Sequence, residues 1–406
     1  MKIFNNLKNP ALAGFFCKVI NEEDGKMNDT EKVQILKDLI AINSVNGNEL
    51  EVAQYLQKLL EKHDIESKLD KFGDNRANLV AELGNKDSKN ILGITGHMDT
   101  VAVNEKEWQY PPFKATIIDD KLYGRGSSDM KSGLAAQVIS LIELKEANQL
   151  PKEGKVRLIV TAGEEYGTPG ANRLQDQNIA QDLSALLVGE PTGGNIIFAH
   201  SGSMNYEVTS EGHAFHSSKP EKGINAIQGL VEFINQEKHL FDDVKQDPYL
   251  GDLKHSITII EGGNQVNIIP DKASLKGNIR PTAIFPNQKV IERLQKLVNE
   301  INQNSEYKLT LNVFQSFQPI ATKPENDFVQ LVLRAAKNNF KDPKLDIING
   351  ATDASVFTLK RPDLPVVVLG PDKWDQAHKT NEYTTISSYL AMIDTYKEII
   401  TDFFNE

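Results

Sequence analysis

The residues best suited to chemistry are acidic and imidazole side chains, each placed at or just past the end of an apolar run. They are His97, Asp99, Asp129, Glu164, Glu165, Glu190 and, far along the chain, His378. Short apolar runs of this kind predict buried strands, and open α/β sheets place their sites at the carboxyl ends of strands. Imidazole nitrogens and carboxylate oxygens suit Zn²⁺, with Co²⁺ or Mn²⁺ as substitutes. The pattern therefore predicts a metal centre.

The first motif is a buried strand over residues 91–96 that ends at His97. The two-residue period of a strand places His97 and Asp99 on the same side. A carboxylate that accepts a hydrogen bond from a ligating imidazole fixes its tautomer, so Asp99 is a candidate partner of His97. A lone histidine at a strand end is more often a plain hydrogen-bonding residue, so this motif alone leaves the role of His97 open.

The second motif is a glycine-bracketed loop, residues 123–133, that delivers Asp129 just before a helix. Asp129 could simply cap that helix, a frequent role for aspartate. Its two oxygens could also bridge two cations held roughly 3.5 to 4 Å apart. The loop matches neither a P-loop nor a dinucleotide-binding turn, which disfavours phosphate binding.

The third motif is the adjacent pair Glu164 and Glu165, which follows the predicted strand at residues 155–162. Adjacent carboxylates point in different directions, so one can bind metal while the other acts on water. Such pairs are also common in solvated turns, but the apolar run before them favours a site. Glu190 ends the next apolar run, and His378 follows a predicted strand at 365–369.

Composition limits what such a centre can belong to. A chain of 406 residues exceeds the size of a single core, so two domains are expected. The net charge of −11 and the lack of a basic face argue against nucleic acid as a partner. The single cysteine, Cys17, cannot form an intramolecular disulfide, which fits the cytoplasm. Residues 1–27 form an N-terminal extension whose apolar patch is too short to span a membrane.

The elements predict an α/β fold with an insertion. In residues 28–201 and 318–406, short apolar strands alternate with amphipathic helices, as in a mixed sheet covered by helices. Residues 202–317 instead predict the order strand, helix, strand, strand, helix, strand, which is the ferredoxin-like α+β arrangement. The expected organisation is a catalytic metal-binding domain, 28–201 with 318–406, and an inserted domain, 202–317.

The chain resembles the M20 family of metallopeptidases and amidohydrolases, in particular the acetylornithine deacetylase and succinyl-diaminopimelate desuccinylase group. The motifs that carry the resemblance are Gly96–Val101, Gly124–Gly133, Gly163–Gly167, Gly189–Thr192 and Ala377–Glu382. It implies a di-zinc exopeptidase-like catalytic domain with an inserted lid and dimerisation domain. It further implies two metal ions, one held by His97 and Glu190, the other by Glu165 and His378, with Asp129 bridging, Glu164 as general base and Asp99 orienting His97.

The resemblance also implies roles for residues outside the metal centre. In Gly212–Pro220 the matching histidine is His216 rather than His213, and in relatives it reaches across a homodimer to polarise the scissile carbonyl. Asn267 and Arg280 match residues that contact substrate, the arginine by gripping a carboxylate. The turn that begins at Gly350 resembles another substrate-facing segment.

The expected activity is hydrolysis of the amide bond of a small N-acyl amino acid by a dimetal-activated water. Desuccinylation of N-succinyl-diaminopimelate, a step of lysine biosynthesis, is the first choice of substrate. Deacetylation of acetylornithine and an M20 dipeptidase or carboxypeptidase activity are the alternatives. A non-catalytic binding protein without metal is a further alternative, but none of the matching ligands or the base is replaced in this sequence.

Overall fold

The computed structural model describes residues 27–405. The predicted extension, residues 1–27, therefore lies outside the described residues apart from Met27, and so does Cys17. None of the helices in the described range combines the length and the apolar character that crossing a membrane requires.

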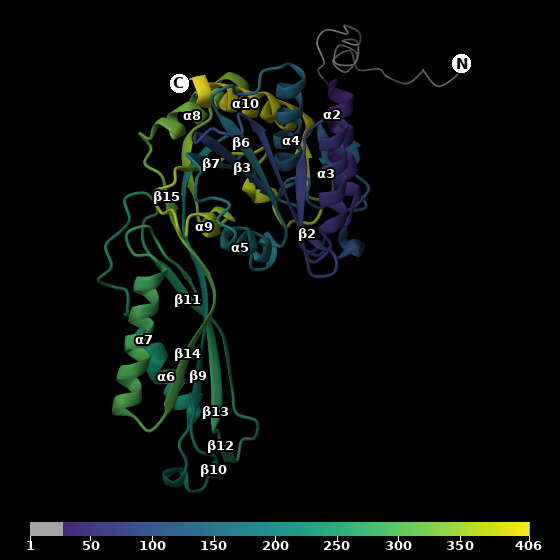
Figure 1. The fold of residues 1–406 in the computed structure, drawn as a ribbon. Helices are drawn as coiled ribbons and strands as arrows, with labels where there is room; N and C mark the ends of the chain where they lie inside the picture. Colours follow the sequence, from purple (N-terminus) through teal and green to yellow (C-terminus); the bar gives the residue numbers. More distant parts are fainter. Residues whose placement is uncertain (1–26, 406) are drawn as a thin grey trace.

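The larger body is built on a nine-stranded mixed sheet (Figure 1). In spatial order its strands are β1 (Ser67–Phe72), β2 (Arg76–Gly84), β6 (Lys155–Thr161), β3 (Ile91–His97), β7 (Ala185–Val188), β17 (Val366–Val368), β8 (Ile196–His200) and β15 (Ile320–Ala321), with β16 (Leu345–Ile348) paired to β8. The four central strands β6, β3, β7 and β17 run parallel to one another. They are buried on both faces, which is why they appear in the sequence as continuous apolar runs.

Helices cover both faces of this sheet. One face packs against α2 (Asp29–Ala41), α3 (Leu50–Lys62), α4 (Lys131–Glu146), α8 (Asp327–Asn339) and α10 (Ile386–Asn405), and the other against α5 (Pro169–Asp176) and α9 (Ala354–Phe357). Side chains of β6 alternate between the two apolar cores, with Leu158 and Val160 in one and Ile159 in the other. A small sheet of β4 (Thr116–Ile118), β5 (Lys121–Tyr123) and β18 (Tyr383–Thr385) joins the loops beside α4 and α10.

A second body projects from the first as a long arm (Figure 1). Its antiparallel sheet has the order β11 (Lys254–Gly262), β13 (Lys272–Arg280), β9 (Ser203–Glu211) and β14 (Lys308–Phe317), and its helices are α6 (Ala226–Glu237) and α7 (Asn287–Asn304). The chain order β9, α6, β11, β13, α7, β14 matches the predicted ferredoxin-like pattern. The predicted domain limits at 202 and 317 remain a prediction, to which the ends of β9 and β14 lie close.

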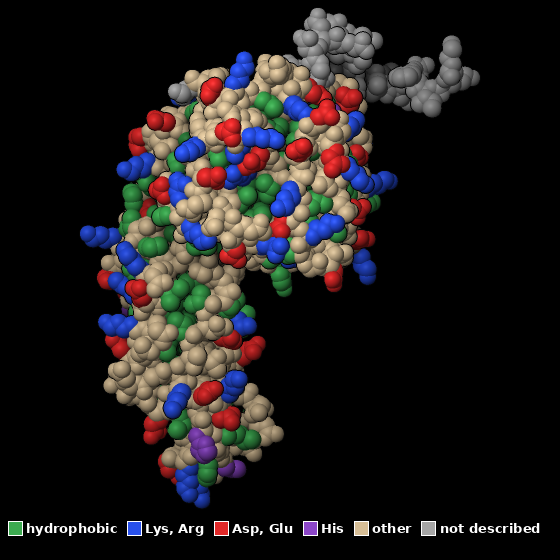
Figure 2. Space-filling model, viewed as in Figure 1, with side chains coloured by type: hydrophobic (Ala, Val, Ile, Leu, Met, Phe, Trp, Pro, Cys, Tyr) green, Lys and Arg blue, Asp and Glu red, His purple; other side chains and the backbone are tan. Residues whose placement is uncertain are grey.

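The far end of the arm carries a two-stranded ribbon of β10 (Phe215–His216) and β12 (Ile268–Ile269). Figure 1 shows this tip at the end of the arm away from the larger sheet, and Figure 2 shows histidine side chains exposed there. Within residues 27–405 there are also four short 3₁₀ helices, η1 (Glu105–Glu107), η2 (Glu164–Tyr166), η3 (Pro220–Lys222) and η4 (Trp374–Gln376).

Candidate metal centre

The candidate ligands gather where the four parallel central strands end. β3 ends at His97, β6 runs into the turn that holds Glu164 and Glu165, and β7 is followed by Glu190. The loop after β17 continues through η4 to His378. Because parallel neighbours have their carboxyl ends at the same edge of the sheet, four distant segments of sequence meet at one place.

The loop that carries Asp129 reaches the same edge because α4 packs very closely there. A Cβ atom at Gly133, in the first turn of α4, would lie 1.9 Å from the carbonyl oxygen of Gly189. Only glycine permits this approach, which sets the loop with Asp129 beside the segment with Glu190. The Asp129 side chain does not cap α4, since the helix follows Met130 as its N-cap and has no side-chain cap.

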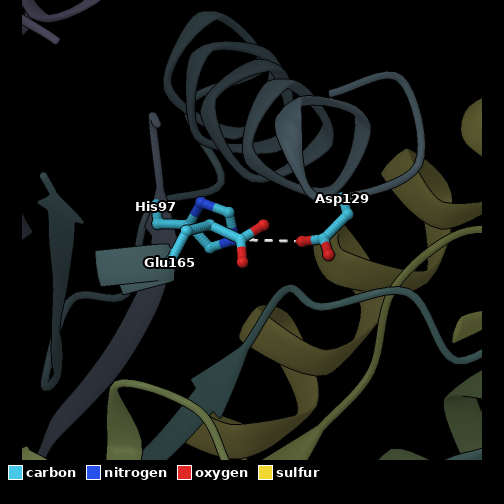
Figure 3. Close-up of side chains that lie close together, drawn as sticks. All are labelled: His97, Asp129 and Glu165. Carbon is cyan, nitrogen blue, oxygen red and sulfur yellow. Dashed lines mark hydrogen bonds and ion pairs between the residues drawn. The ribbon is translucent and has the colours of Figure 1, made fainter. Parts of the chain in front are cut away.

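One group of donors surrounds His97 (Figure 3). Its Nε2 lies 3.0 Å from Oδ1 of Asp129 and 3.4 Å from Oε1 of Glu190. His97, Glu164 and Glu190 each offer a ligand atom within 4.8 Å of the other two, and so do His97, Asp129 and Glu165.

A second group surrounds His378. Its Nε2 lies 2.7 Å from Oε1 of Glu165 and 3.4 Å from Oδ2 of Asp129. Asp129 thus presents one oxygen to each imidazole, as a carboxylate shared by two cations must. The two imidazoles differ in exposure, because the His97 side chain is 1% exposed and that of His378 is 53% exposed.

Asp99 acts mainly on the turn that carries the two glutamates. Its carboxylate accepts hydrogen bonds from the backbone N–H groups of Gly163, Glu164 and Glu165 at 2.8 to 3.1 Å. The Nδ1 atom of His97 lies 3.0 Å from the carbonyl oxygen of Asp99 and 3.5 Å from its carboxylate. Asp99 therefore contacts the His97 imidazole at Nδ1 and holds the backbone of the turn that carries Glu164 and Glu165.

The described residues of this cluster bring more carboxylates together than their imidazoles can neutralise. Burial raises the pKa of Glu164 well above its usual value, and the carboxylates of Glu190 and Asp353 add to this against the opposing charge of His97. Burial likewise raises the pKa of Glu190, whose Oε2 has no hydrogen-bond partner. Hydrogen bonds with Asp129 and Glu165 raise the pKa of His378 to about 10.

The donor set fits two divalent cations. Two imidazole nitrogens and several carboxylate oxygens converge in a partly closed site, and one oxygen of Glu190 is left without a partner. Cations at this place would neutralise the clustered carboxylates and take up the unpartnered oxygen. On this chemistry the cluster is a candidate dinuclear metal site.

The other predicted site residues lie elsewhere. His216 and Asn267 are both at the tip of the arm, where the N–H of Ser217 donates to the carbonyl of Asn267. Arg280 lies at the opposite end of β13, next to Pro281, whose carbonyl accepts a hydrogen bond from Gly202 at the junction of the two bodies. Gly350 follows β16 in the larger body and packs against Trp374.

Several residues of the site were not singled out by the sequence analysis. Asp353 is buried, accepts a hydrogen bond of 2.5 Å from Thr161 at the end of β6, and has an unpartnered Oδ1. Arg125 and Glu382 form a buried ion pair of 2.6 Å beside the loop with Asp129. Asp353 is 192 positions from Thr161, and Glu382 is 257 positions from Arg125. No local sequence pattern can pair residues so far apart, although Arg125 and Glu382 each lie inside a motif named above.

Comparisons with known proteins identify the family of the chain. Residues 93–402 match the profile of peptidase family M20/M25/M40. A protein of Staphylococcus aureus named probable succinyl-diaminopimelate desuccinylase is 38% identical over 93% of this chain and 98% of its own length. The succinyl-diaminopimelate desuccinylase of a Wolbachia strain is 27% identical over 92% of this chain and 94% of its own.

Solved structures show the same fold. An M20 family metallo-carboxypeptidase from Sulfolobus solfataricus superposes with a TM-score of 0.76 at 21% identity, over 94% of this chain and all of its own. A dinuclear metal-binding M20 peptidase from Bacillus subtilis superposes with a TM-score of 0.71 at 16% identity, over 93% and 98%. At these identities the structural likeness concerns the fold alone.

Proposed function

The chain belongs to peptidase family M20/M25/M40, and on this premise we propose that it is a zinc-dependent N-succinyl-diaminopimelate desuccinylase. The relatives that carry this name align over almost the whole chain. The observation that carries the proposal is the shared carboxylate of Asp129, with one oxygen toward His97 and one toward His378. We assign His97 and Glu190 to one ion, Glu165 and His378 to the other, and Asp129 to both.

Glu164 is the proposed general base. Two divalent cations in the site would supply Lewis acidity, which lowers the pKa of a water molecule and polarises an acyl carbonyl. Glu164 lies among the donors, and Asp99 fixes its backbone through hydrogen bonds to the turn. Its carboxylate accepts the proton of the attacking water and returns it to the leaving nitrogen.

Arg280 is the proposed grip on the substrate carboxylate. It is half-buried, burial lowers the pKa of its guanidinium, and no carboxylate within residues 27–405 pairs with it. A charged, partly desolvated guanidinium group that no carboxylate pairs with favours an anionic ligand. The succinyl group of the proposed substrate ends in a carboxylate, whereas the acetyl group of acetylornithine does not.

We further propose a homodimer formed through the arm. His216 and Asn267 lie at the tip, and Figure 1 shows the tip at the end of the arm away from β3, β6 and β7, the strands whose carboxyl ends lead to the metal ligands. His216 of a partner could enter the site and donate from Nε2 to the oxyanion, because its Nδ1 accepts the N–H of Ser218. β11 is an open edge of the arm sheet with exposed Ile259 and Ile260, the kind of strand that pairs with a second copy.

The substrate is tested with the zinc-loaded protein and a panel of N-succinyl-diaminopimelate, N-acetylornithine and dipeptides. We expect the succinyl compound to have the highest kcat/KM. Arg280→Lys should lower that value about 10- to 100-fold, mainly through KM, while the already weak acetylornithine reaction changes little. Arg334→Lys, at an exposed arginine in α8 of the other body, controls for the Arg-to-Lys substitution itself. Faster turnover of acetylornithine or a dipeptide would contradict the substrate assignment, as would an unaltered KM in Arg280→Lys.

A further inference from the structure

The buried carboxylate of Glu382 lies four residues after His378, yet its bonds go to the loop that carries Asp129. Its side chain has no exposed surface. Oε1 accepts from the backbone N–H groups of Ser128 at 2.8 Å and Asp129 at 2.9 Å. Oε2 accepts from the N–H of Gly126 at 3.1 Å and from Nη1 of Arg125 at 2.6 Å. Four donors therefore converge on one carboxylate.

The bonds of Arg125 run in the opposite direction. Arg125 belongs to the Asp129 loop, but its Nη1 donates to the carbonyl of Lys379 at 3.3 Å and its Nη2 to the carbonyl of His378 at 3.4 Å. The guanidinium also lies against the ring of Trp108, 5.2 Å from its centroid. Each loop thus contributes one charged side chain that binds the backbone of the other loop.

His378 needs such support more than the other imidazole ligand. His97 ends a strand that is buried along its whole length, whereas residues 378–380 are exposed. His378 also has φ of 63°, a left-handed conformation that is unfavourable for a residue with a side chain. Besides the bonds from Arg125, the segment is held by a hydrogen bond of 2.7 Å from the N–H of Gln109 to the side-chain oxygen of Asn381, and the His378 imidazole contacts Glu165 at 2.7 Å.

We propose that Arg125 and Glu382 are positioning residues that clamp the Asp129 loop to the His378 loop and so set the affinity of the metal position between Asp129, Glu165 and His378. The inference rests on the proposed dinuclear centre. Asp129 belongs to both positions, but the other position also draws on His97 and Glu190, which are held by the strands β3 and β7 and do not touch the clamp. Weakening the clamp should therefore lower zinc affinity more at the position that includes His378 than at the position that includes His97.

Zinc titration against a competing chelator tests the clamp. The wild-type protein should bind two zinc ions with two resolvable dissociation constants. Glu382→Gln places an amide NH₂ against backbone N–H donors. Arg125→Lys keeps the positive charge but removes the two guanidinium nitrogens that donate to Glu382, His378 and Lys379. In either variant we expect the dissociation constant of the position that includes His378 to rise about 10- to 100-fold, as for other partners of metal-binding groups, and that of the position that includes His97 to rise clearly less. In a His378→Ala background, Glu382→Gln should change the affinity of the remaining zinc by much less than it changes the affinity of the His378 position in the wild-type background.

Glu143→Gln is the matched control. Glu143 is also a buried carboxylate in an ion-pair network, bonded to Lys32 at 2.8 Å and Lys397 at 2.6 Å, but it joins α2, α4 and α10. This variant should lower Tm and leave both zinc constants unchanged. If Glu382→Gln fails to fold, as judged by circular dichroism, Arg125→Lys and Glu382→Asp provide the same comparison.

The outcomes separate the inference from the function on which it rests. If the wild-type protein binds no zinc, the proposed metal centre fails. If it binds two ions and the folded clamp variants bind both as tightly as wild type, or lose both equally, the clamp is overturned while the metal centre stands.

Discussion

At the scale of single residues, the central feature is that Glu164 and Glu165 are neighbours with different surroundings. Both lie near His97, but Glu165 also contacts His378 and lies near Asp129, whereas Glu164 lies near Glu190. Asp99 holds the backbone N–H of both, so the turn presents the two carboxylates to different parts of the cluster. One side chain can then bind metal while the other handles protons.

The adjacent pair offers a matched test. Glu164→Gln removes the proton acceptor but keeps size and polarity, so we expect a folded protein with unchanged metal content and turnover reduced about 10²- to 10⁴-fold. Glu165→Gln removes a ligand, so it should lower metal content as well. Metal analysis and steady-state kinetics on both variants check this. Near-native turnover in Glu164→Gln would refute its role as base.

The sequence predicted which residue types meet, because donors at the ends of consecutive strands of a parallel sheet must share an edge. It could not predict that the Asp99 carboxylate binds the turn of Glu164, or that Arg125 pairs with Glu382. These contacts depend on the path of two loops that are far apart in the chain. Choosing His216 over His213 rested on the resemblance, and it remains a prediction.

At the scale of elements, the arm is held together by its own apolar core and by polar contacts between helix and strand. Tyr206 and Phe233 pack between β9 and α6, and His255 in β11 donates to Glu237 at the end of α6 at 2.6 Å. The hydrogen bond with Glu237 raises the pKa of His255, although partial burial opposes it. The strands and helices of the arm were predictable from alternation and amphipathic period, but this contact was not.

The His255 contact predicts a pH-dependent contribution to the stability of the arm. A histidine whose pKa is raised by folding stabilises the folded state below its unfolded pKa, near 6.5, and this contribution is lost as pH rises through the folded pKa. His255→Asn should therefore lower Tm more at about pH 6 than at about pH 9, by an amount that corresponds to roughly 1 kcal/mol. Thermal unfolding at both pH values measures this, with the exposed His239→Asn as control. An equal loss at both values would contradict the assignment.

At the scale of the whole molecule, the arm separates the tip residues from the metal centre. His216 and Asn267 are neighbours in the same ribbon, so in the proposed homodimer both would enter the partner subunit's site together. The fold class and the insertion followed from the change of pattern near residue 202. The length and direction of the arm could not be predicted, because they depend on how two segments cross between the bodies rather than on any periodicity.

Mixing two inactive variants tests whether the site is shared between subunits. His216→Ala and Glu164→Gln should each be nearly inactive alone. After subunit exchange at equal amounts, half of the dimers are mixed and each has one complete site, so activity should recover to about a quarter of wild type. Complementation assays with and without exchange measure this. No recovery in verified mixed dimers would show that His216 does not act across the dimer.

The most direct test of the metal centre is a titration of the metal-depleted protein with zinc while desuccinylation is followed. The convergence of Asp129 with both His97 and His378 predicts that activity is absent without metal and that binding saturates at two equivalents per chain. Full activity in the protein freed of metal, or zinc binding that saturates below two equivalents per chain, would contradict the account.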